Sequence, residues 1–132
     1  MIAKQIDYLS DLKWKNRILI VLSDDQFQFF KKIEQNIKGL DERDFLMIIF
    51  NNNIAFIGKK PMSEKFSRSV GYKIKDINRS HRLILIGKDG NIKSSYLFET
   101  ELEKIFYDVD KMPMRKYEMK IRNNSKRDYI VE

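Results

Sequence analysis

Three short apolar runs without polar interruption constrain the fold of this chain more than any other feature. They are Ile18 to Leu22, Phe45 to Phe50 and Leu83 to Ile86. A strand with one solvated face alternates apolar and polar residues, whereas an unbroken apolar run indicates a strand that is buried on both faces. The three runs therefore predict strands in the middle of a parallel or mixed sheet.

A fourth strand is predicted over Asn91 to Phe98, where apolar and polar residues alternate in part. This partial alternation is typical of a half-exposed or edge strand. The preceding segment, Gly87-Lys88-Asp89-Gly90, places two glycines around an aspartate, which favours a tight turn with positive φ. We therefore expect the third and fourth strands to be antiparallel neighbours.

Helical spacing of apolar residues, together with turn residues, predicts the remaining elements. The first is a helix from Asp25 to Lys38, ended by Gly39 in a left-handed conformation. A turn at Asn51 to Asn53, a short strand from Ile54 to Ile57 and a chain break at Gly58 to Pro61 follow. The last two are a helix from Ser63 to Val70 stopped by Gly71 and a helix after Thr100. Thr100 and Glu103 have the spacing of a capping box, in which two side chains satisfy backbone donors at a helix start.

The predicted order is β-α-β-(β)-α-β-β-α followed by a basic extension. With right-handed crossovers, this is the order of the thioredoxin fold. We predict an α/β, thioredoxin-like three-layer fold with a mixed sheet of four or five strands, helices on both faces and a basic C-terminal helix or tail. The 132 residues fit one domain, which we place at residues 1–122, with a polar, flexible tail at residues 123–132.

The chain contains no cysteine. This excludes a Cys-x-x-Cys redox pair, a disulfide framework and thiol-ligated metal sites, so the protein is not a thiol-disulfide oxidoreductase. His81 is the single histidine, and the spaced oxygen ligands of a calcium loop are missing around Asp108 and Asp110. We therefore predict no metal site and no cofactor.

The net charge of +7 is concentrated near the C-terminus. Residues 111–127 contain seven cations and one anion, which leaves +6 in this segment and +1 in the rest of the chain. Such a distribution is typical of a basic interaction arm. It predicts an acidic partner, either a protein or an acidic polymer.

The segment from Asp110 to Arg115 has two interpretations. In the structural one, Pro113 opens a final helix, an apolar stripe runs along it, and Asp110 caps the helix or pairs with Arg115. In the other, the two methionines form an adaptable docking surface beside a basic outer side. The predicted partner-binding residues are Asp110, Met112, Pro113, Met114, Arg115, Lys116, Lys120 and Arg122.

Four segments in order resemble a known family: Trp14-Lys15-Asn16-Arg17, Gly39-Leu40-Asp41-Glu42-Arg43-Asp44, Leu85 to Lys93, and Asp110-Lys111-Met112-Pro113-Met114-Arg115. The chain is similar to domain-of-unknown-function 4174 proteins, from about Leu12 to Arg122. That family has bacterial, often exported, members and occurs in vertebrate matrix proteins with sushi repeats or coiled-coil-containing names. The resemblance implies a thioredoxin-like fold without an established activity.

Both parts of the thioredoxin redox site are replaced in this chain. Ser23-Asp24-Asp25-Gln26 stands where thioredoxins have Cys-x-x-Cys, and Ser80-His81-Arg82 stands where they have a cis-proline. Open α/β sheets bind ligands at the carboxyl ends of their strands, so Ser23, Asp24, Asp25 and His81 form a candidate pocket. The competing interpretation is that one of the first three residues caps a helix.

No apolar stretch reaches the roughly 20 residues that a transmembrane helix needs, and the N-terminus lacks the pattern of a secretory signal. We therefore expect no transmembrane segment. Resemblance to an often exported family is compatible with a periplasmic or secreted mature form, and the sequence fixes neither the location nor the oligomeric state.

We predict a non-catalytic, thioredoxin-like binding module. Two alternatives stay open. One is an enzyme, a hydrolase or a non-thiol redox-related protein, acting at the carboxyl end of the sheet. The other is a non-specific binder of anionic polymer, nucleic acid or a membrane surface, which needs little more than the basic segment.

Overall fold

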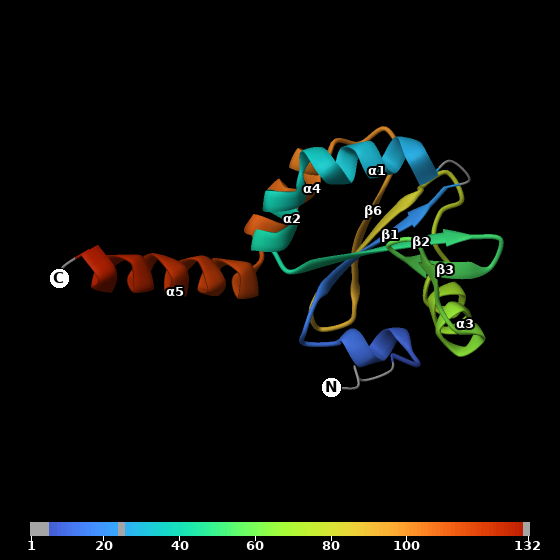
Figure 1. Cartoon of the computed structure of the whole chain (residues 1–132), viewed down its shortest axis with the longest axis horizontal. Coiled ribbons are helices and arrows are strands. Elements are labelled where there is room, and N and C mark those ends of the chain that lie inside the picture. Colours follow the sequence, from blue (N-terminus) through green and yellow to red (C-terminus); the bar gives the residue numbers. More distant parts are fainter. Residues whose placement is uncertain (1–5, 24–25, 131–132) are drawn as a thin grey trace. The chain divides into compact units, whose positions relative to one another are not determined.

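A computed structural model describes residues 6–23 and 26–130, and the chain divides into two compact units, residues 1–100 and 101–132. The elements of the first unit are η1 (Leu9–Leu12), β1 (Arg17–Leu22), α1 (Gln26–Gln35), α2 (Ile37–Glu42), β2 (Phe45–Asn51), β3 (Ile54–Ile57), β4 (Lys60–Pro61), α3 (Glu64–Lys73), β5 (Leu83–Ile86) and β6 (Ile92–Tyr96). The second unit contains α4 (Leu102–Asp110) and α5 (Pro113–Ile130) (Figure 1).

One sheet organises the first unit, with the strand order β4-β3-β2-β1-β5-β6. β1 and β2 are parallel and all other neighbours are antiparallel. The three uninterrupted apolar runs form the neighbouring strands β2, β1 and β5, as predicted. The predicted antiparallel pairing of β5 with β6 and the position of β6 at a sheet edge are also confirmed.

Helices cover both faces of this sheet. Alternate residues of β1 point to opposite faces, and Ile18 and Ile20 belong to a buried cluster with Leu12 of η1 and Phe66 of α3. α1 and α2 lie on the other side of the sheet from η1 and α3 (Figure 1). The first unit is therefore a three-layer α/β structure, and the predicted thioredoxin-like fold is confirmed.

The helix expected from Asp25 to Lys38 is broken in two. Asn36, with φ −127° and ψ 17°, separates α1 from α2, and its amide Nδ2 donates a 2.8 Å hydrogen bond to the Lys32 carbonyl. An asparagine side chain that bonds to the backbone competes with the helical pattern in this way. Gly39 lies inside α2, so the expected left-handed stop at Gly39 is wrong; the left-handed residue is Asp44, with φ 54°.

Gly71 and the segment before Pro61 also differ from expectation. Gly71 lies within α3, where an added Cβ would be 3.4 Å from Cζ of Phe50, so this glycine permits close packing of the helix on β2. Lys60–Pro61 pairs with β3 as a short edge strand. The sheet therefore has six strands, where we predicted four or five.

In the second unit, α4 begins at Leu102 with Glu101 at the N-cap and no side-chain cap hydrogen bond. The capping box predicted for Thr100 and Glu103 is therefore wrong. The apolar residues of this helix are buried: Leu102, Ile105, Phe106 and Val109.

α5 begins at Pro113, as predicted, because proline lacks a backbone N–H that the first helical turn leaves unpaired anyway. α5 continues to Ile130 and so enters the segment 123–132, whose flexibility stays a prediction. In the part of the chain that the structure describes, no helix is long and apolar enough to cross a bilayer.

Candidate functional site

The carboxyl end of β1 holds one member of the predicted pocket. Ser23 follows this strand and lines an open cavity of about 540 Å³. The other lining residues are Leu22, Arg79, Ser80, Arg82, Leu97, Phe98 and Glu99. Asp24 and Asp25, also expected here, lie outside the described residues.

His81 has a different environment from Ser23. Its Nδ1 is 2.5 Å from Oγ of Ser95, on the edge strand β6, and it is not among the described residues that line this cavity. The serine that His81 contacts is therefore Ser95, and the described lining of the cavity at Ser23 does not include His81.

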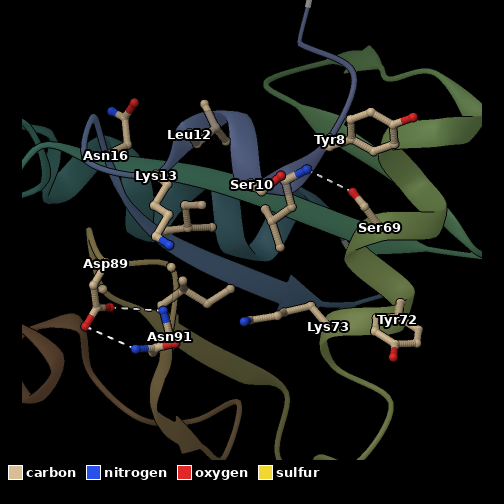
Figure 2. Close-up of a pocket in the computed structure, with 15 residues that line it drawn as sticks. Tyr8, Ser10, Leu12, Lys13, Asn16, Ser69, Tyr72, Lys73, Asp89 and Asn91 are labelled. Atoms are coloured by element: carbon tan, nitrogen blue, oxygen red, sulfur yellow. Dashed lines mark hydrogen bonds between the residues drawn. The ribbon is translucent and has the colours of Figure 1, made fainter.

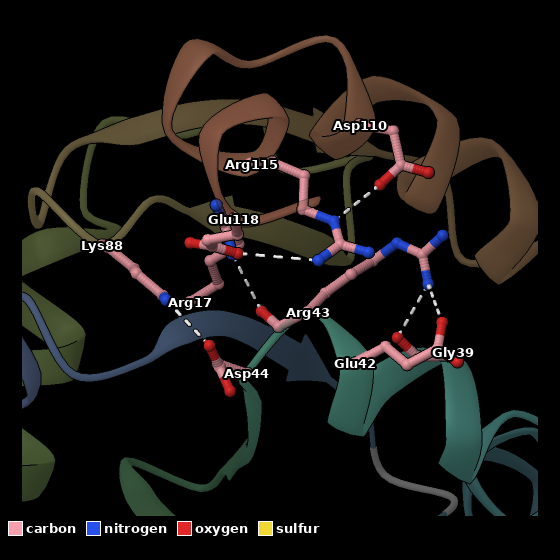
Figure 3. A network of polar contacts seen from close by, with 9 residues as sticks. All are labelled: Arg17, Gly39, Glu42, Arg43, Asp44, Lys88, Asp110, Arg115 and Glu118. Atoms are coloured by element: carbon pink, nitrogen blue, oxygen red, sulfur yellow. Dashed lines mark hydrogen bonds and ion pairs between the residues drawn. The ribbon is translucent and has the colours of Figure 1, made fainter. Parts of the chain in front are cut away.

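The segment Asp110 to Arg115 contains an ion pair in which the arginine is buried and the aspartate is partly exposed (Figure 3). Nε of Arg115 is 3.0 Å from Oδ1 of Asp110, and its Nη1 is 3.6 Å from Oε1 of Glu118. The Arg115 side chain is 4% exposed. The predicted pairing of Asp110 with Arg115 is therefore confirmed, whereas the interpretation that placed Arg115 on the basic outer side of the helix is wrong. A buried guanidinium needs such carboxylate partners, so this residue fixes the first turn of α5.

The remaining side chains of early α5 are largely exposed. Met114, Tyr117 and Ile121 are 39%, 65% and 46% exposed. Their spacing of three and four residues places them along one side of the helix. Lys116, Lys120 and Arg122 are also exposed, whereas Met112 is half-buried. The helix therefore presents an apolar stripe, defined here as Met114, Tyr117 and Ile121, beside basic residues.

Three segments that carry the family resemblance meet at the amino ends of β1 and β2. The backbone N–H of Trp14 donates to the Lys88 carbonyl at 2.6 Å. Nζ of Lys88 lies 2.8 Å from Oδ2 of Asp44, whose carbonyl accepts from the N–H of Arg17 at 3.0 Å (Figure 3). Residues far apart in the sequence therefore form one polar network, named here the amino-end network.

Arg17 is the most buried charged residue of this network, with 1% exposure. Its Nη1 donates to the Arg43 carbonyl at 3.0 Å, and Nη1 of Arg43 donates to the Gly39 carbonyl at 2.8 Å. Trp14 and Asp44 have φ of 68° and 54°, a region that is unfavourable for residues with a side chain. Such strained conformations persist where surrounding contacts determine the backbone.

A cavity of about 290 Å³ lies beside the amino-end network (Figure 2). Its apolar floor consists of Leu9, Leu12, Ile18 and Ile86, all of them buried. Its polar lining comes from Tyr8, Ser10, Lys13 and Asn16 around η1, Ser69, Tyr72 and Lys73 of α3, and Gly87, Asp89, Gly90 and Asn91 of the β5–β6 turn. Two of the family-like segments, around Asn16 and around Gly87 to Asn91, therefore contribute to its wall.

Asp89 organises the turn in this wall. Nζ of Lys93 is 2.6 Å from its Oδ2, and the backbone N–H of Asn91 donates to its Oδ1 at 3.0 Å. These contacts, the Lys93 hydrogen bond first, hold the pKa of the Asp89 carboxyl below its usual value, while partial burial acts in the opposite direction. Asp89 is therefore ionised and its charge is offset by Lys93.

The family of the chain follows from a comparison of its sequence with known families. The sequence model of a family described as a domain of unknown function (DUF4174) matches residues 8–118. The chain belongs to the DUF4174 family. This confirms the resemblance carried by the four segments. No curated protein matches the sequence of this DUF4174 member.

Solved structures similar to this DUF4174 chain include peroxiredoxins. Thioredoxin peroxidase I of Plasmodium yoelii is 14% identical to this chain with a TM-score of 0.51. The match covers 77% of this chain and 75% of the Plasmodium yoelii chain. The apo form of Trgpx is 22% identical with a TM-score of 0.50, and the match covers 76% of this chain and 82% of the Trgpx chain. The reduced 2-Cys peroxiredoxin of Plasmodium vivax is 12% identical with a TM-score of 0.50, and the match covers 89% of this chain and 84% of the Plasmodium vivax chain. At these identities the likeness concerns the fold alone.

Two lining residues of the smaller cavity were missed by sequence reasoning, Lys13 and Lys73. Lys13 directly precedes Trp14-Lys15-Asn16-Arg17, one of the segments that carry the family resemblance. This position is the sequence signal that could have pointed to Lys13. Lys73 carries no such signal, because only the packing of α3 beside η1 brings it to the cavity.

Proposed function

We propose that this DUF4174 domain is a non-catalytic binding module that docks through α5 onto a protein with an apolar groove and an acidic rim. The observation that carries the proposal is the exposed apolar stripe of Met114, Tyr117 and Ile121. Helices that insert into apolar grooves present anchors at this spacing. The absence of cysteine from the whole sequence removes the thiol chemistry of the thioredoxin fold.

The chemistry of the partner follows from charge. Lys116 and Lys120 lie beside the stripe and are exposed, and the segment 111–127 carries +6. Complementary charges steer association and orient the docked partner, while apolar anchors supply most of the affinity. An acidic rim around an apolar groove satisfies both features, whereas a purely acidic polymer would leave the stripe exposed to water.

Buried Arg115 supports this function indirectly. Its ion pair with Asp110 ties the first turn of α5 to the end of α4 within the second unit, and its pair with Glu118 lies within α5. A helix whose start is fixed presents its anchors with less loss of conformational entropy on binding. In this proposal Asp110 and Arg115 hold the docking helix in place, and the contacts to the partner come from the exposed residues.

The test is affinity capture from the source cell with three variants of the full chain. The first, Met114→Ser/Tyr117→Ser/Ile121→Ser, removes the stripe. The second, Lys116→Gln/Lys120→Gln, removes neighbouring charge. The third, Tyr107→Ser, is a matched control, because Tyr107 of α4 is 60% exposed and lies outside the stripe.

We expect a protein with an acidic surface that the wild-type chain and the Tyr107→Ser control retain at high salt. The stripe variant should lose it, and the charge variant should bind it more slowly and with weaker salt dependence. Capture of nucleic acid or anionic lipid that depends on the two lysines alone would contradict the proposal and favour a simple electrostatic binder. Equal capture by the stripe variant and the wild type would also contradict it.

A further inference from the structure

The smaller cavity, of about 290 Å³, has features of a ligand site that the proposed function does not use. Its floor is apolar, while Lys13 and Lys73 are the two cations among its described lining residues. Its volume lies just below the range of about 300–1,000 Å³ that is typical of small-molecule sites. A ligand of this cavity would therefore be small.

The two lysines approach the cavity from different elements. Lys73, half-buried at the end of α3, extends toward the turn that holds Asp89 and Asn91 (Figure 2). Lys13 follows η1, and an added Cβ on Gly90 would lie 3.5 Å from its Cδ, so its aliphatic stem passes over the same turn. In the described part of the chain, Lys73 has no carboxylate partner, and Lys13 has only a ring contact at 5.7 Å, to Trp14.

The other polar groups of the wall are largely occupied. Oγ of Ser69 accepts from the Leu9 N–H and donates to the Phe66 carbonyl, and the charge of Asp89 is offset by Lys93. Two ammonium groups therefore give the cavity its positive character. Lysine recognises an anion as a point charge, while the apolar floor favours a ligand that also buries a hydrocarbon surface.

We propose that this cavity binds a small organic anion with a carboxylate head, held between Lys13 and Lys73, and an apolar body seated on Leu9, Leu12, Ile18 and Ile86. The glycines of the β5–β6 turn contribute to the shape of the site. A Cβ on Gly87 would lie 2.6 Å from Cε of Lys93 and 3.1 Å from Oδ1 of Asp89, so a side chain there would disturb the turn. This proposal stands apart from docking through α5, because all its residues belong to the first unit.

The test is an NMR titration of the full-length, ¹⁵N-labelled chain with phenylacetate. Phenethylamine and 2-phenylethanol are the matched probes with a cationic and a neutral head, and inorganic phosphate is a probe without an apolar body. We expect phenylacetate to shift amides around Ser10, Ser69 and Asn91 with a Kd on the order of 1 mM, as expected for a ligand of about ten heavy atoms. The other three probes should shift them far less at equal concentration.

Variants of the two lysines locate the site. Lys73→Gln and, separately, Lys13→Gln should weaken phenylacetate binding by at least about threefold. Lys65→Gln is the matched control, since Lys65 is an exposed lysine of the same helix α3 and does not line the cavity; its affinity should equal that of the wild type. A dispersed spectrum of each variant shows that it is folded.

Four results would overturn the proposal: no shift with phenylacetate, binding of phenethylamine or 2-phenylethanol as tight as that of phenylacetate, equivalent shifts with phosphate, or unchanged affinity in both lysine variants.

Discussion

The two ends of the sheet in the first unit differ in how their polar groups are used. At the carboxyl end of β1, where thioredoxin-like folds carry out redox chemistry, Ser23 lines an open cavity with exposed Arg79 and Arg82. At the amino end, buried Arg17 and the contact of Lys88 with Asp44 belong to one network. Three segments that mark the family meet at this second end, so the features that distinguish this chain are placed away from the usual active site of the fold.

In our proposal, the function of this chain does not depend on the usual active site of the fold. The likeness to peroxiredoxins concerns the sheet and its helices, while the cysteine chemistry is absent from the sequence. A fold retained without its chemistry can serve as a scaffold for binding at other surfaces.

The largest expected effect comes from Arg17→Ala at the amino end. It removes a buried guanidinium that donates to the Arg43 carbonyl and leaves a void, so the free energy of unfolding should fall by about 3 kcal/mol in urea denaturation. Arg68→Ala is the matched control, because Arg68 is 79% exposed and pairs with exposed Glu64. The Arg68→Ala variant should lose less than about 1 kcal/mol of the free energy of unfolding. Equal losses in the two variants would contradict the claim that the buried network at the amino end stabilises the fold.

A smaller effect is expected from Lys88→Met. It removes the contact with Asp44 while keeping most of the apolar stem, and Lys88 is 12% exposed, so we expect a loss of about 1–2 kcal/mol in the free energy of unfolding. In hydrogen exchange, the Trp14 and Arg17 amides should lose protection before the amides in the middle of β5. Unchanged protection at these two amides would show that Lys88 does not support the network.

The pH dependence of the free energy of unfolding tests how much the Asp89 carboxylate stabilises the β5–β6 turn beside the amino-end network. Its pKa is lowered in the folded state, chiefly by Lys93, so the ionised carboxyl stabilises the fold above its unfolded pKa of about 3.9. This contribution is lost as the pH falls through the lower, folded pKa. Asp89→Asn should therefore be less stable than the wild type at pH 7, and the difference should shrink below about pH 4. A difference that stays constant between pH 7 and pH 2 would contradict this account.

The smallest effect is expected at the carboxyl end, from Arg82→Gln. The side chain of Arg82 is exposed, so the free energy of unfolding should change by no more than about 0.5 kcal/mol in urea denaturation. A loss of unfolding free energy as large as that of Arg17→Ala would show that polar side chains at the two ends of the sheet stabilise the fold equally, which would contradict the difference described above.

Most of the sheet was predictable from the sequence, because the runs beginning at Ile18, Phe45 and Leu83 can be buried on both faces only in a sheet interior. The errors concern residues whose local preference was outweighed by packing. Gly71 has the sequence character of a helix stop, yet it lies inside α3 against Phe50. Thr100 and Glu103 have capping-box spacing, yet α4 starts after Glu101.

The candidate sites were less predictable than the fold. The stripe of Met114, Tyr117 and Ile121 follows from helical spacing, but whether it is buried or exposed depends on tertiary structure. The same limit applies to Arg115, which its sequence neighbours placed on a basic surface and which is buried. The cavity beside the amino-end network joins Lys13 to Lys73, and no periodicity in the sequence links residues so far apart.

The most direct test of the central claim compares partner capture by two full-chain variants, one altered at the proposed docking surface on α5 and one altered at the carboxyl end of the sheet. One carries Met114→Ser/Tyr117→Ser/Ile121→Ser on α5, and the other carries Ser23→Ala/Arg79→Gln/Arg82→Gln at the carboxyl end of the sheet. The account predicts that the α5 variant loses the captured protein and that the carboxyl-end variant retains it at the wild-type level. Retention by the α5 variant together with loss by the carboxyl-end variant would contradict it.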